Sequence, residues 1–388
     1  MKRLKGLSLF ANVGVAEAYL EEIGLDILIA NEIEEKRAEF YKHLYPKTNM
    51  IIGDITDEEI RKQIIKEAID KEIDFIIATP PCQGMSLAGK LDPLDPRNQL
   101  IYFAVEVIKK VKPKFILLEN VPQQLKTKIK YNDELIAIPD YIKKELSEYY
   151  EFNNQPLVKA MHYGVPQMRQ RSIFLMSRKD VEFKETEFRW EFPEATEEDI
   201  ITLEEALKDV PSLDPIVKEG YEQTIELFPD FEKKKEEAAK ISKWHKPPTH
   251  ARRHIEWMMH TPTGQTAFDN KIYYPQKPNG DRIKGHYNHY RRLEWDKPSR
   301  TITQNNGVIS SLACVHPGKL ISDDGTEEGR IYSDPRCFSI YELLIVTSLP
   351  EDWNIPDWAN ERMIRSVIGE GIPPLLVKRI VEYLIDNI

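Results

Sequence analysis

Short apolar runs alternate with amphipathic stretches along the first half of the chain. The runs, at residues 7–10, 27–30, 73–79 and 115–118, are short and continuous, as buried parallel strands usually are. Two stretches, 57–72 and 98–111, place their apolar side chains on one helical face, which predicts a helix in each. This alternation predicts an α/β fold with a doubly wound parallel sheet, and residues 171–176 are predicted as a further strand.

The charge pattern changes in the second half. Residues 179–240 hold 9 basic and 20 acidic side chains, whereas residues 243–292 hold 10 basic and 3 acidic ones, with six of the nine histidines and seven aromatic residues. Proline and glycine punctuate the basic stretch, so we predict that it is rich in loops. Thr202 and Glu205 form a capping-box pattern that starts a helix, and residues 374–388 have the pattern of a terminal amphipathic helix.

Length and composition exclude several classes of protein. A chain of 388 residues, 10% of them aromatic, is long enough for two domains with apolar cores. No apolar run is long enough to span a membrane, and the amino terminus lacks the apolar core of a signal peptide. Cys82, Cys314 and Cys337 are too few for a disulfide framework or a cysteine zinc site, so we predict a reduced, cytoplasmic protein. The net charge of −10, taken by itself, argues against a nucleic-acid partner.

Three polar motifs adjoin predicted strands, where an α/β sheet carries its ligands. Residues 78–84 read Ala-Thr-Pro-Pro-Cys-Gln-Gly, and the two prolines fix the turn that presents Cys82 at the mouth of a cleft. A lone cysteine is more often a small buried residue, and a nucleophilic one needs activation of its thiol. Glu119 follows the next apolar run; taken alone, such a residue is more often a solvated loop carboxylate, but beside a cysteine it could donate a proton to a substrate ring. The third motif is an extended segment that projects three donors to one face, which suits an anionic or carbonyl-bearing ligand: Gln167, Arg169 and Arg171.

Together these motifs resemble those of the cytosine-5 DNA methyltransferases of bacterial restriction-modification type. The resemblance covers residues 7–178 and 288–388 in the usual motif order. It implies a Rossmann-like, S-adenosylmethionine-dependent methyltransferase domain over residues 1–182, completed by 335–388, and a smaller, loop-rich target-recognition domain over residues 183–334. Two further blocks contribute to it: Tyr290-Arg291-Arg292-Leu293 with Trp295, Pro298, Ser299, Thr301, Ile302 and Thr303, and Gly369-Glu370-Gly371-Ile372-Pro373-Pro374.

The resemblance implies a reaction at C5 of a cytosine flipped out of duplex DNA. Cys82 would add to C6 and Glu119 would hydrogen-bond and protonate N3, while Arg171, with Arg169 nearby, would hold the base and the cysteine loop. The enamine formed in this way attacks the sulfonium methyl group, and loss of the C5 proton then expels the cysteine. An ordinary glutamate is rarely protonated at neutral pH, so we predict that burial or the flipped base raises the pKa of Glu119.

The resemblance also assigns residues to S-adenosylmethionine and its product S-adenosylhomocysteine. Phe10 would pack near the adenine and Glu32 would bind the ribose hydroxyls. The other implied pocket residues are Asn12, Gly14, Ile33, Asp54, Ile55, Pro80, Leu100 and Glu370. The glycine-rich turn of the family keeps only Gly14 of three glycines here; Asn12 readily adopts positive φ, whereas Val15 does so only at a cost. Glu370 stands where the family usually has asparagine and adds a negative charge near the cofactor.

The basic stretch falls in the recognition region of the family, where phosphate contacts and groove-reading side chains are expected. We interpret residues 249–253 as a helix start at backbone phosphates, and expect the acidic stretch to turn away from DNA. The histidines match no standard zinc site, so no metal is predicted. Contacts with the base or the DNA are implied for Gln83, Ser86, Asn120, Val121, Gln167, Arg252, Arg253, Arg291, Arg292, Thr301 and Thr303.

We therefore expect a monomeric DNA (cytosine-5-)-methyltransferase of the prokaryotic cytoplasm and nucleoid. It would act on double-stranded DNA, protect host DNA, and share its site with a cognate restriction endonuclease. Two alternatives stay open: an RNA (tRNA) cytosine-5 methyltransferase, and a non-catalytic DNA-binding relative or partner subunit. A nicotinamide-dependent dehydrogenase is a more distant alternative, because the glycine fingerprint is too degraded to support it.

Overall fold

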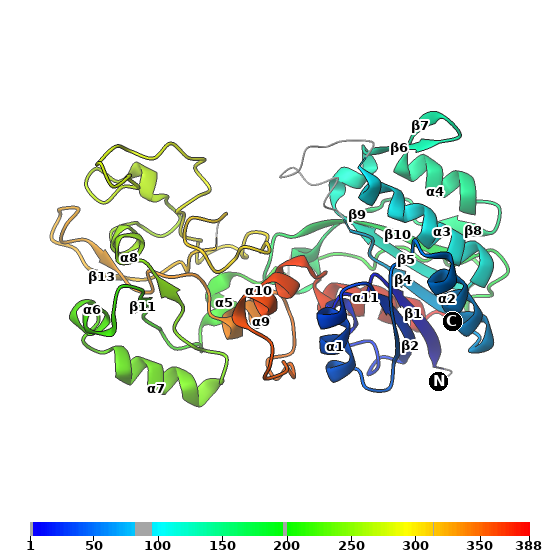
Figure 1. Cartoon of the computed structure of the whole chain (residues 1–388), viewed down its shortest axis with the longest axis horizontal. Helices are drawn as coiled ribbons and strands as arrows, with labels where there is room; N and C mark the ends of the chain where they lie inside the picture. Colours follow the sequence, from blue (N-terminus) through cyan, green and yellow to red (C-terminus); the bar gives the residue numbers. More distant parts are fainter. Residues whose placement is uncertain (1–2, 82–94, 197–199, 313) are drawn as a thin grey trace.

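The computed structural model describes residues 3–81, 95–196, 200–312 and 314–388. Figure 1 shows two lobes joined by a narrower middle, with both ends of the chain in the larger lobe. Three residues of the sequence-based site, Cys82, Gln83 and Ser86, lie outside the described residues.

The larger lobe is built on a twisted sheet in the order β3-β2-β1-β4-β5-β10-β8, with β9 paired to β10. The first five strands are parallel, as predicted. The further strand predicted over residues 171–176 is confirmed as β10, and it runs antiparallel to β5, β8 and β9. The strands are β1 (Leu4–Leu9), β2 (Leu25–Glu32), β3 (Asn49–Ile52), β4 (Phe75–Ala78), β5 (Phe115–Asn120), β8 (Tyr150–Phe152), β9 (Leu157–Lys159) and β10 (Gln170–Arg178).

The reversed direction of β10 matters for the site. Because β10 is antiparallel, its first residues lie beside the last residues of β5, where Ser172 pairs with Asn120 and Ile173 pairs with Glu119. A parallel strand would bring its own last residues to that edge instead. The antiparallel pairing therefore carries Arg171 to the same edge as Glu119.

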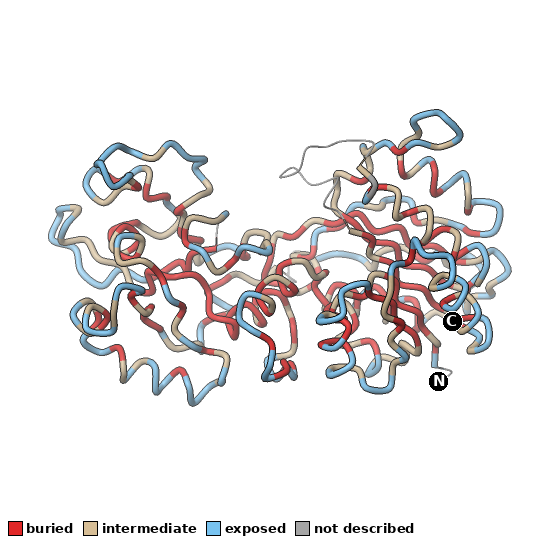
Figure 2. Tube along the Cα trace, in the orientation of Figure 1, coloured by how far each residue is buried: buried red, intermediate tan, exposed pale blue. Residues whose placement is uncertain are grey.

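Helices cover both faces of the sheet, and the apolar side chains of each strand alternate between them. In β4, Ile76 and Ala78 belong to one core and Phe75 and Ile77 to the other. Figure 2 shows the resulting band of buried strands between exposed helix surfaces. The first core packs against α2 (Glu58–Asp70), α3 (Leu100–Val111) and α4 (Ile138–Leu146), and the second against α11 (Pro374–Ile385). A small hairpin, β6 (Lys128–Tyr131) with β7 (Glu134–Ala137), extends from this lobe.

The segment after β10 stays with the larger lobe. Phe183 and Phe188 pack against the core beneath α11, and the ring of Trp190 contacts those of Phe75 and Phe115. Residues 183–192 therefore contact the core of the larger lobe.

Helices from distant parts of the chain form the middle of the molecule (Figure 1). They share one core with the turn after β1, because Val13 and Val15 pack with Phe338 and Ile364. The predicted capping box is confirmed, since Thr202 and Glu205 bond reciprocally at the start of α5. The helices of this core are α1 (Glu35–Leu44), α5 (Leu203–Leu207), α9 (Ile340–Val346) and α10 (Glu361–Glu370).

The smaller lobe has short elements and long loops, as predicted for the basic stretch. Between residues 260 and 319 its described part holds a single short helix, η6 (Ala267–Asp269). Figure 1 places α7 on the opposite side of this lobe from the loops that follow α8. Its other elements are β11 (Ile216–Val217), α6 (Tyr221–Leu227), α7 (Phe231–Ile241), β12 (Thr249–His250), α8 (Arg252–Met259), β13 (Leu320–Ser322) and β14 (Ile331–Tyr332). No helix among the described residues of either lobe is long and apolar enough to cross a membrane.

Candidate active site

The predicted site residues converge on the carboxyl edge of the parallel strands. The turn from Phe10 to Gly14 follows β1, Glu32 ends β2, Pro80 follows β4 and Asn120 ends β5. This edge is where open α/β sheets bind their ligands, because the loops that leave the strands there are free to surround a substrate.

Glu119 and Arg171 form a buried ion pair at this edge. Arg171 Nε lies 2.7 Å from Glu119 Oε1, and each side chain is only about a tenth exposed. Burial raises the pKa of the Glu119 carboxyl above its ordinary value, although the guanidinium groups of Arg171 and Arg169 lower it. The carboxyl group is thus held in one orientation by an arginine, in surroundings that favour its protonated form.

Asn120 connects the end of β5 to the loop after β4. Its side-chain amide donates to the carbonyl oxygen of Pro80 at 2.9 Å, and its Oδ1 accepts the Val121 N–H at 2.8 Å. Thr79 Oγ1 donates to the carbonyl oxygen of Phe10 at 3.1 Å, which ties the same loop to the turn after β1. These bonds fix the backbone two residues before Cys82. Asn120 therefore acts here on the protein itself, through its Pro80 contact.

The turn after β1 adopts left-handed backbone at three alternate positions. The φ angles are 58° at Phe10, 50° at Asn12 and 77° at Gly14. The expectation for Asn12 is confirmed, whereas the positive φ of Phe10 has no signal in the sequence. A side chain at Gly14 would lie 2.3 Å from the Tyr45 ring, and the Tyr45 hydroxyl donates to the Gly14 carbonyl at 2.6 Å. The turn is therefore held from below by α1 and the residue that follows it.

Glu32 and Asn12 carry the polar groups of this turn. Glu32 accepts the backbone N–H of Asn12 at 2.8 Å and that of Glu34 at 2.9 Å, one on each carboxylate oxygen. Burial raises the pKa of Glu32, while these two bonds lower it. Asn12 Oδ1 is buried and accepts no hydrogen bond from any described residue. An unsatisfied buried acceptor beside a carboxylate with spare lone pairs fits a ligand that brings its own donors, as the amino and ribose hydroxyl groups of S-adenosylmethionine do.

The negative charge of Glu370 is neutralised within the protein. Arg37 Nη1 lies 2.7 Å from Glu370 Oε2 and Nη2 donates to Oε1 at 3.1 Å. Asn12 Nδ2 donates to the same carboxylate at 2.9 Å. Arg37 was missed by sequence reasoning, because nothing in the sequence of α1 indicates a partner at the other end of the chain.

The other predicted cofactor residues differ in exposure. Ile33 is largely exposed, just after β2, whereas Ile55 is buried in the core of the sheet. Asp54 is exposed and its carboxylate accepts the Thr56 N–H at 2.8 Å. Leu100, at the start of α3, is partly buried and packs against the sheet core, as Val121 also does. Ile33 and Asp54 are thus accessible to a ligand in this conformation, and Ile55 is not.

Two residues of the third motif point into the connection between the lobes. Gln167 is fully buried; its Oε1 accepts the Ile302 N–H at 3.1 Å and its amide donates to the Val346 carbonyl. Arg169 is also buried and donates to the carbonyl oxygens of Ile302 and Gly369 at 2.8 and 3.0 Å. Gln167 therefore has no surface to offer to a substrate here, and of the three donors Arg171 alone pairs with Glu119.

The residues predicted to contact DNA divide into buried and accessible ones. Arg292 is fully buried and donates to the carbonyl oxygens of Met258, His316 and Asp334, and this burial lowers its pKa to about 9. The expectation that Arg292 faces DNA is corrected on this ground, because the guanidinium satisfies interior carbonyl groups. Arg253 is exposed on α8.

Three other predicted DNA contacts already have partners within the protein. Arg252 pairs with Glu226 and Glu256, at 3.1 and 2.9 Å. Arg291 lies 3.6 Å from Glu294, and Thr301 donates to the carbonyl oxygen of Met168 at 3.3 Å. Thr303 is partly buried, and a Cβ at Gly369 would lie 2.2 Å from its carbonyl oxygen.

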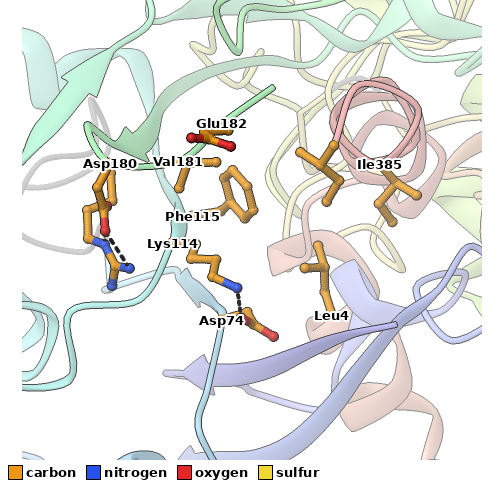
Figure 3. Close-up of a pocket in the computed structure, with 10 residues that line it drawn as sticks. Leu4, Asp74, Lys114, Phe115, Asp180, Val181, Glu182 and Ile385 are labelled. Atoms are coloured by element: carbon orange, nitrogen blue, oxygen red, sulfur yellow. Dashed lines mark hydrogen bonds and ion pairs between the residues drawn. The ribbon is translucent and has the colours of Figure 1, made fainter. Parts of the chain in front are cut away.

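A pocket of about 370 Å³ lies at the opposite edge of the sheet (Figure 3). It is lined where β1, β4 and β5 begin, by Leu4, Asp74 and Phe115, and by Ile385 of α11. Four of its charged side chains already have partners, since Lys114 pairs with Asp74 at 2.9 Å and Arg178 with Asp180 at 2.6 Å. The pocket is therefore separate from the carboxyl edge that carries the site.

The fold and the site define a Rossmann-like methyltransferase domain that carries a second lobe. The model of the family described as C-5 cytosine-specific DNA methylase matches residues 4–386. The chain belongs to this family, and it is therefore a methyltransferase.

Comparison with individual proteins extends this result along the chain. The type II methyltransferase M1.HgaI of Avibacterium volantium is 39% identical over 391 residues, which cover 100% of this chain and 99% of the relative. The type II methyltransferase M.NgoPII of Neisseria gonorrhoeae is 33% identical over 211 residues, which cover 53% of this chain and 57% of the relative. A solved Escherichia coli prophage protein, described as a DNA modification methyltransferase, superposes with a TM-score of 0.66 at 22% identity and covers 99% of both chains. The solved structure of a Spodoptera frugiperda DNMT2 mutant superposes with a TM-score of 0.58 at 15% sequence identity, and the match covers 99% of this chain and 98% of the mutant. The structures confirm the predicted fold.

Proposed function

We propose that the chain is a DNA (cytosine-5-)-methyltransferase of a type II restriction-modification system. It transfers a methyl group from S-adenosylmethionine to C5 of a cytosine flipped out of a specific duplex sequence. The observation that carries the proposal is the buried Glu119–Arg171 pair at the carboxyl edge of the sheet, in a chain that matches the family from residue 4 to residue 386. The relative M1.HgaI supports the type II assignment, because the likeness includes the whole smaller lobe.

On the base side, the chain must make cytosine C5 nucleophilic. Cys82 adds to C6 as a thiolate, and Glu119 delivers a proton to N3, so that the ring becomes an enamine. Burial favours the protonated carboxyl that this step needs, and Arg171 holds it in one orientation. After methyl transfer the C5 proton is lost to a base, the C5–C6 double bond re-forms as the thiolate leaves, and the N3 proton returns to the Glu119 carboxylate. Asn120 assists by fixing the Pro80 carbonyl, and with it the start of the cysteine loop.

On the cofactor side, bound S-adenosylmethionine supplies an electrophilic methyl group. Glu32 accepts the ribose hydroxyls on lone pairs that its two backbone partners leave available. Ile33 offers its exposed side chain to the adenine, and Asn12 Oδ1 takes a donor from the cofactor. Val13, Val15 and the α10 end pack beneath the turn, so that water is excluded from that side.

The duplex lies between the two lobes, with the loops that follow α8 turned towards it. Arg253 contacts the phosphates from its exposed position on α8. The enzyme is a monomer of the cytoplasm and nucleoid, and a cognate endonuclease cleaves the same sequence when it is unmethylated. The proposed domains are residues 1–182 completed by 335–388, and residues 183–334; the packing of Trp190 on the larger lobe favours a first limit nearer residue 193.

Bisulfite sequencing of DNA from cells that express the protein tests the proposal. The wild-type chain should methylate one short sequence at nearly all its occurrences, and Cys82→Ala should methylate none. Cys314→Ala is the matched control, since this second thiol lies buried in the smaller lobe and should leave the pattern unchanged. An unmethylated genome in cells that contain folded wild-type protein would overturn the proposal.

Two further assays distinguish the alternatives. Transfer of labelled methyl groups to tRNA, and not to duplex DNA, would identify an RNA methyltransferase. Binding to DNA without a covalent complex on 5-fluorocytosine DNA would identify a non-catalytic relative, because the fluorine blocks release of an enzyme that has already added its cysteine.

A further inference from the structure

Glu370, the last residue of α10, connects this helix to three segments that are distant in the sequence. Its carboxylate accepts hydrogen bonds from Asn12 of the turn after β1, Arg37 of α1, Gln304 and Ser366. The distances range from 2.7 to 3.1 Å, and the side chain is about one-fifth exposed. A partly buried carboxylate with this many donors is an ordered group.

Arg37 makes this arrangement possible. Its guanidinium reaches Glu370 with two nitrogens, at 2.7 and 3.1 Å, while its Nε lies 3.0 Å from Glu34. Without the arginine, the Glu370 charge would stand unpaired near Glu32 and Glu34, which would weaken any ligand that needs Glu32. Arg37 therefore allows a glutamate to stand beside the turn after β1.

On its other side, Glu370 contacts the segment that leads to the smaller lobe. Gln304 donates to Oε1 at 2.7 Å, and Arg169 donates both to the Glu370 carbonyl and to the Ile302 carbonyl. Gly369 is packed so closely on this segment that a Cβ would lie 2.2 Å from the Thr303 carbonyl oxygen. The segment 302–304 and the end of α10 are therefore held in close contact.

We propose that the Arg37–Glu370 pair is a latch through which cofactor binding and DNA binding support each other. Asn12 connects the latch to the cofactor turn, and Gln304 connects it to the segment that leads to the smaller lobe. Arg37 is thus a positioning residue, which touches neither substrate. The proposal rests on the proposed function, since it requires that both S-adenosylmethionine and duplex DNA bind.

The physical basis is a shared polar network. A ligand that orders Asn12 also orders Glu370, and the ordered carboxylate then holds Gln304 and the chain beside it. The second ligand consequently has less of the network left to order, and it binds more tightly. Coupling of two binding equilibria is reciprocal, so it can be measured from the cofactor side alone.

Calorimetric titration of S-adenosylhomocysteine, without and with duplex DNA that carries the methylated site, tests the latch. We expect the duplex to tighten binding to the wild-type chain by about 5-fold or more, and to the variants Arg37→Met and Glu370→Gln by less than 2-fold. The double variant should lose no more coupling than either single variant, since the two residues act as one unit. Lys109→Met, which removes a salt bridge to Glu145 elsewhere in the same lobe, should keep the wild-type ratio.

The outcomes separate the latch from a structural role. A structural role alone would lower affinity or melting temperature and leave the ratio of the two dissociation constants unchanged; that result would overturn the proposal. A wild-type ratio of 1 would overturn it as well. If Arg37→Met does not fold, Arg37→Lys can replace it, because lysine keeps the positive charge without the two-nitrogen contact of the guanidinium. It should give a ratio of the two dissociation constants between those of the wild type and Glu370→Gln. Failure of the proposed function appears differently, as a wild-type protein that methylates no DNA.

Discussion

Replacing Glu119 with glutamine tests the proton-donor role directly. The amide is nearly the same size as the carboxyl and still accepts a hydrogen bond from Arg171, so the geometry at the end of β5 is preserved. It holds no acidic proton to deliver to N3. Because burial raises the pKa of Glu119, the wild-type rate should decline as the pH rises through that pKa, while the need for a Cys82 thiolate lowers the rate on the acidic side of the optimum. Glu119→Gln should lose this alkaline decline, since the side chain no longer titrates.

The size of the effect follows from the setting of the side chain. A positioned general acid contributes about 10²- to 10⁴-fold to a rate. We therefore expect Glu119→Gln to decrease the methylation rate by a factor in that range at the wild-type pH optimum. The Glu119 and Arg171 side chains are 11% and 9% exposed, 2.7 Å apart. Loss of the negative charge leaves Arg171 buried without a counter-ion, but the amide oxygen still accepts its N–H. We therefore expect a loss of about 1–2 kcal/mol in unfolding free energy, below the 3–5 kcal/mol typical of a fully broken pair.

Single-turnover methylation of duplex DNA from pH 5.5 to pH 9 measures both effects, with stability followed by urea unfolding. Glu145→Gln is the matched control: Glu145 belongs to α4, bonds to Lys109 and Tyr131, and lies away from the carboxyl edge. It should keep the wild-type rate and profile. If Glu119→Gln shows the wild-type rate with the wild-type pH dependence, Glu119 is not the acid.

Four further substitutions probe the fold and the DNA surface. Gly369→Ala should lower the unfolding free energy by about 1–3 kcal/mol, because the new Cβ would lie 2.2 Å from the Thr303 carbonyl oxygen; an unchanged urea midpoint would contradict the close packing. Arg292→Ala should destabilise the protein by about 3–5 kcal/mol, since it removes a large buried side chain and the donor to the His316 carbonyl, and weakens the bonding of the Met258 and Asp334 carbonyls. A loss of DNA affinity at unchanged stability would instead place Arg292 on the surface. Arg253→Ala should weaken binding to all duplexes alike and reduce the slope of log K against log salt by about 1, with the melting temperature unchanged; no change in slope would remove it from the interface. Burial raises the pKa of Glu17 from 4.5 to about 7. The protonated group therefore adds about 3 kcal/mol of stability that is fully present below pH 4.5 and is lost as the pH rises through 7. Glu17→Gln should abolish that part of the pH dependence of the unfolding free energy, and an unaltered dependence would refute the assignment.

Local patterns predicted the elements that depend on neighbouring residues. Thr202 caps α5, and Asp57 caps α2 by accepting the Glu59 N–H, because each cap is made within three residues of the chain. The buried strands were recognised from continuous apolar runs. The direction of β10 could not be predicted from the sequence, because a run such as residues 171–176 is equally apolar whether the strand is parallel or antiparallel to its neighbours.

The site was predictable where a motif adjoins a strand, and not where distant segments meet. Glu119 was predicted because it follows an apolar run that reads as a strand. Arg171 was predicted because its motif directly precedes another such run. Arg37 and Glu370 are 333 positions apart, so no spacing could connect them. Gln167 and Arg292 carry side chains that suit a polar ligand, and the same hydrogen-bonding capacity serves the protein interior equally well.

The charge pattern shows how folding changes what a sequence count means. Because the whole chain carries −10 and residues 243–292 carry +7, the remainder carries −17, and this segregation removes the objection to a nucleic-acid partner. Yet the positive side chains of that stretch do not all face solvent. Arg292 is interior, and Arg252 is held partly by Glu226 of the acidic stretch, so some acidic residues hold a cation and do not simply turn away.

Lys243 and Arg291 pair with Asp357 and Glu294, at 3.3 and 3.6 Å. The six other basic side chains of the stretch form no ion pair with any described residue: Lys246, Arg253, Lys271, Lys277, Arg282 and Lys284. Since each phosphate contact contributes about 0.9 to the salt slope of duplex binding, the stretch supplies a slope of about 5 at most. The folded lobe therefore offers DNA fewer charges than its sequence suggests, and shape and base contacts must supply the rest of its affinity.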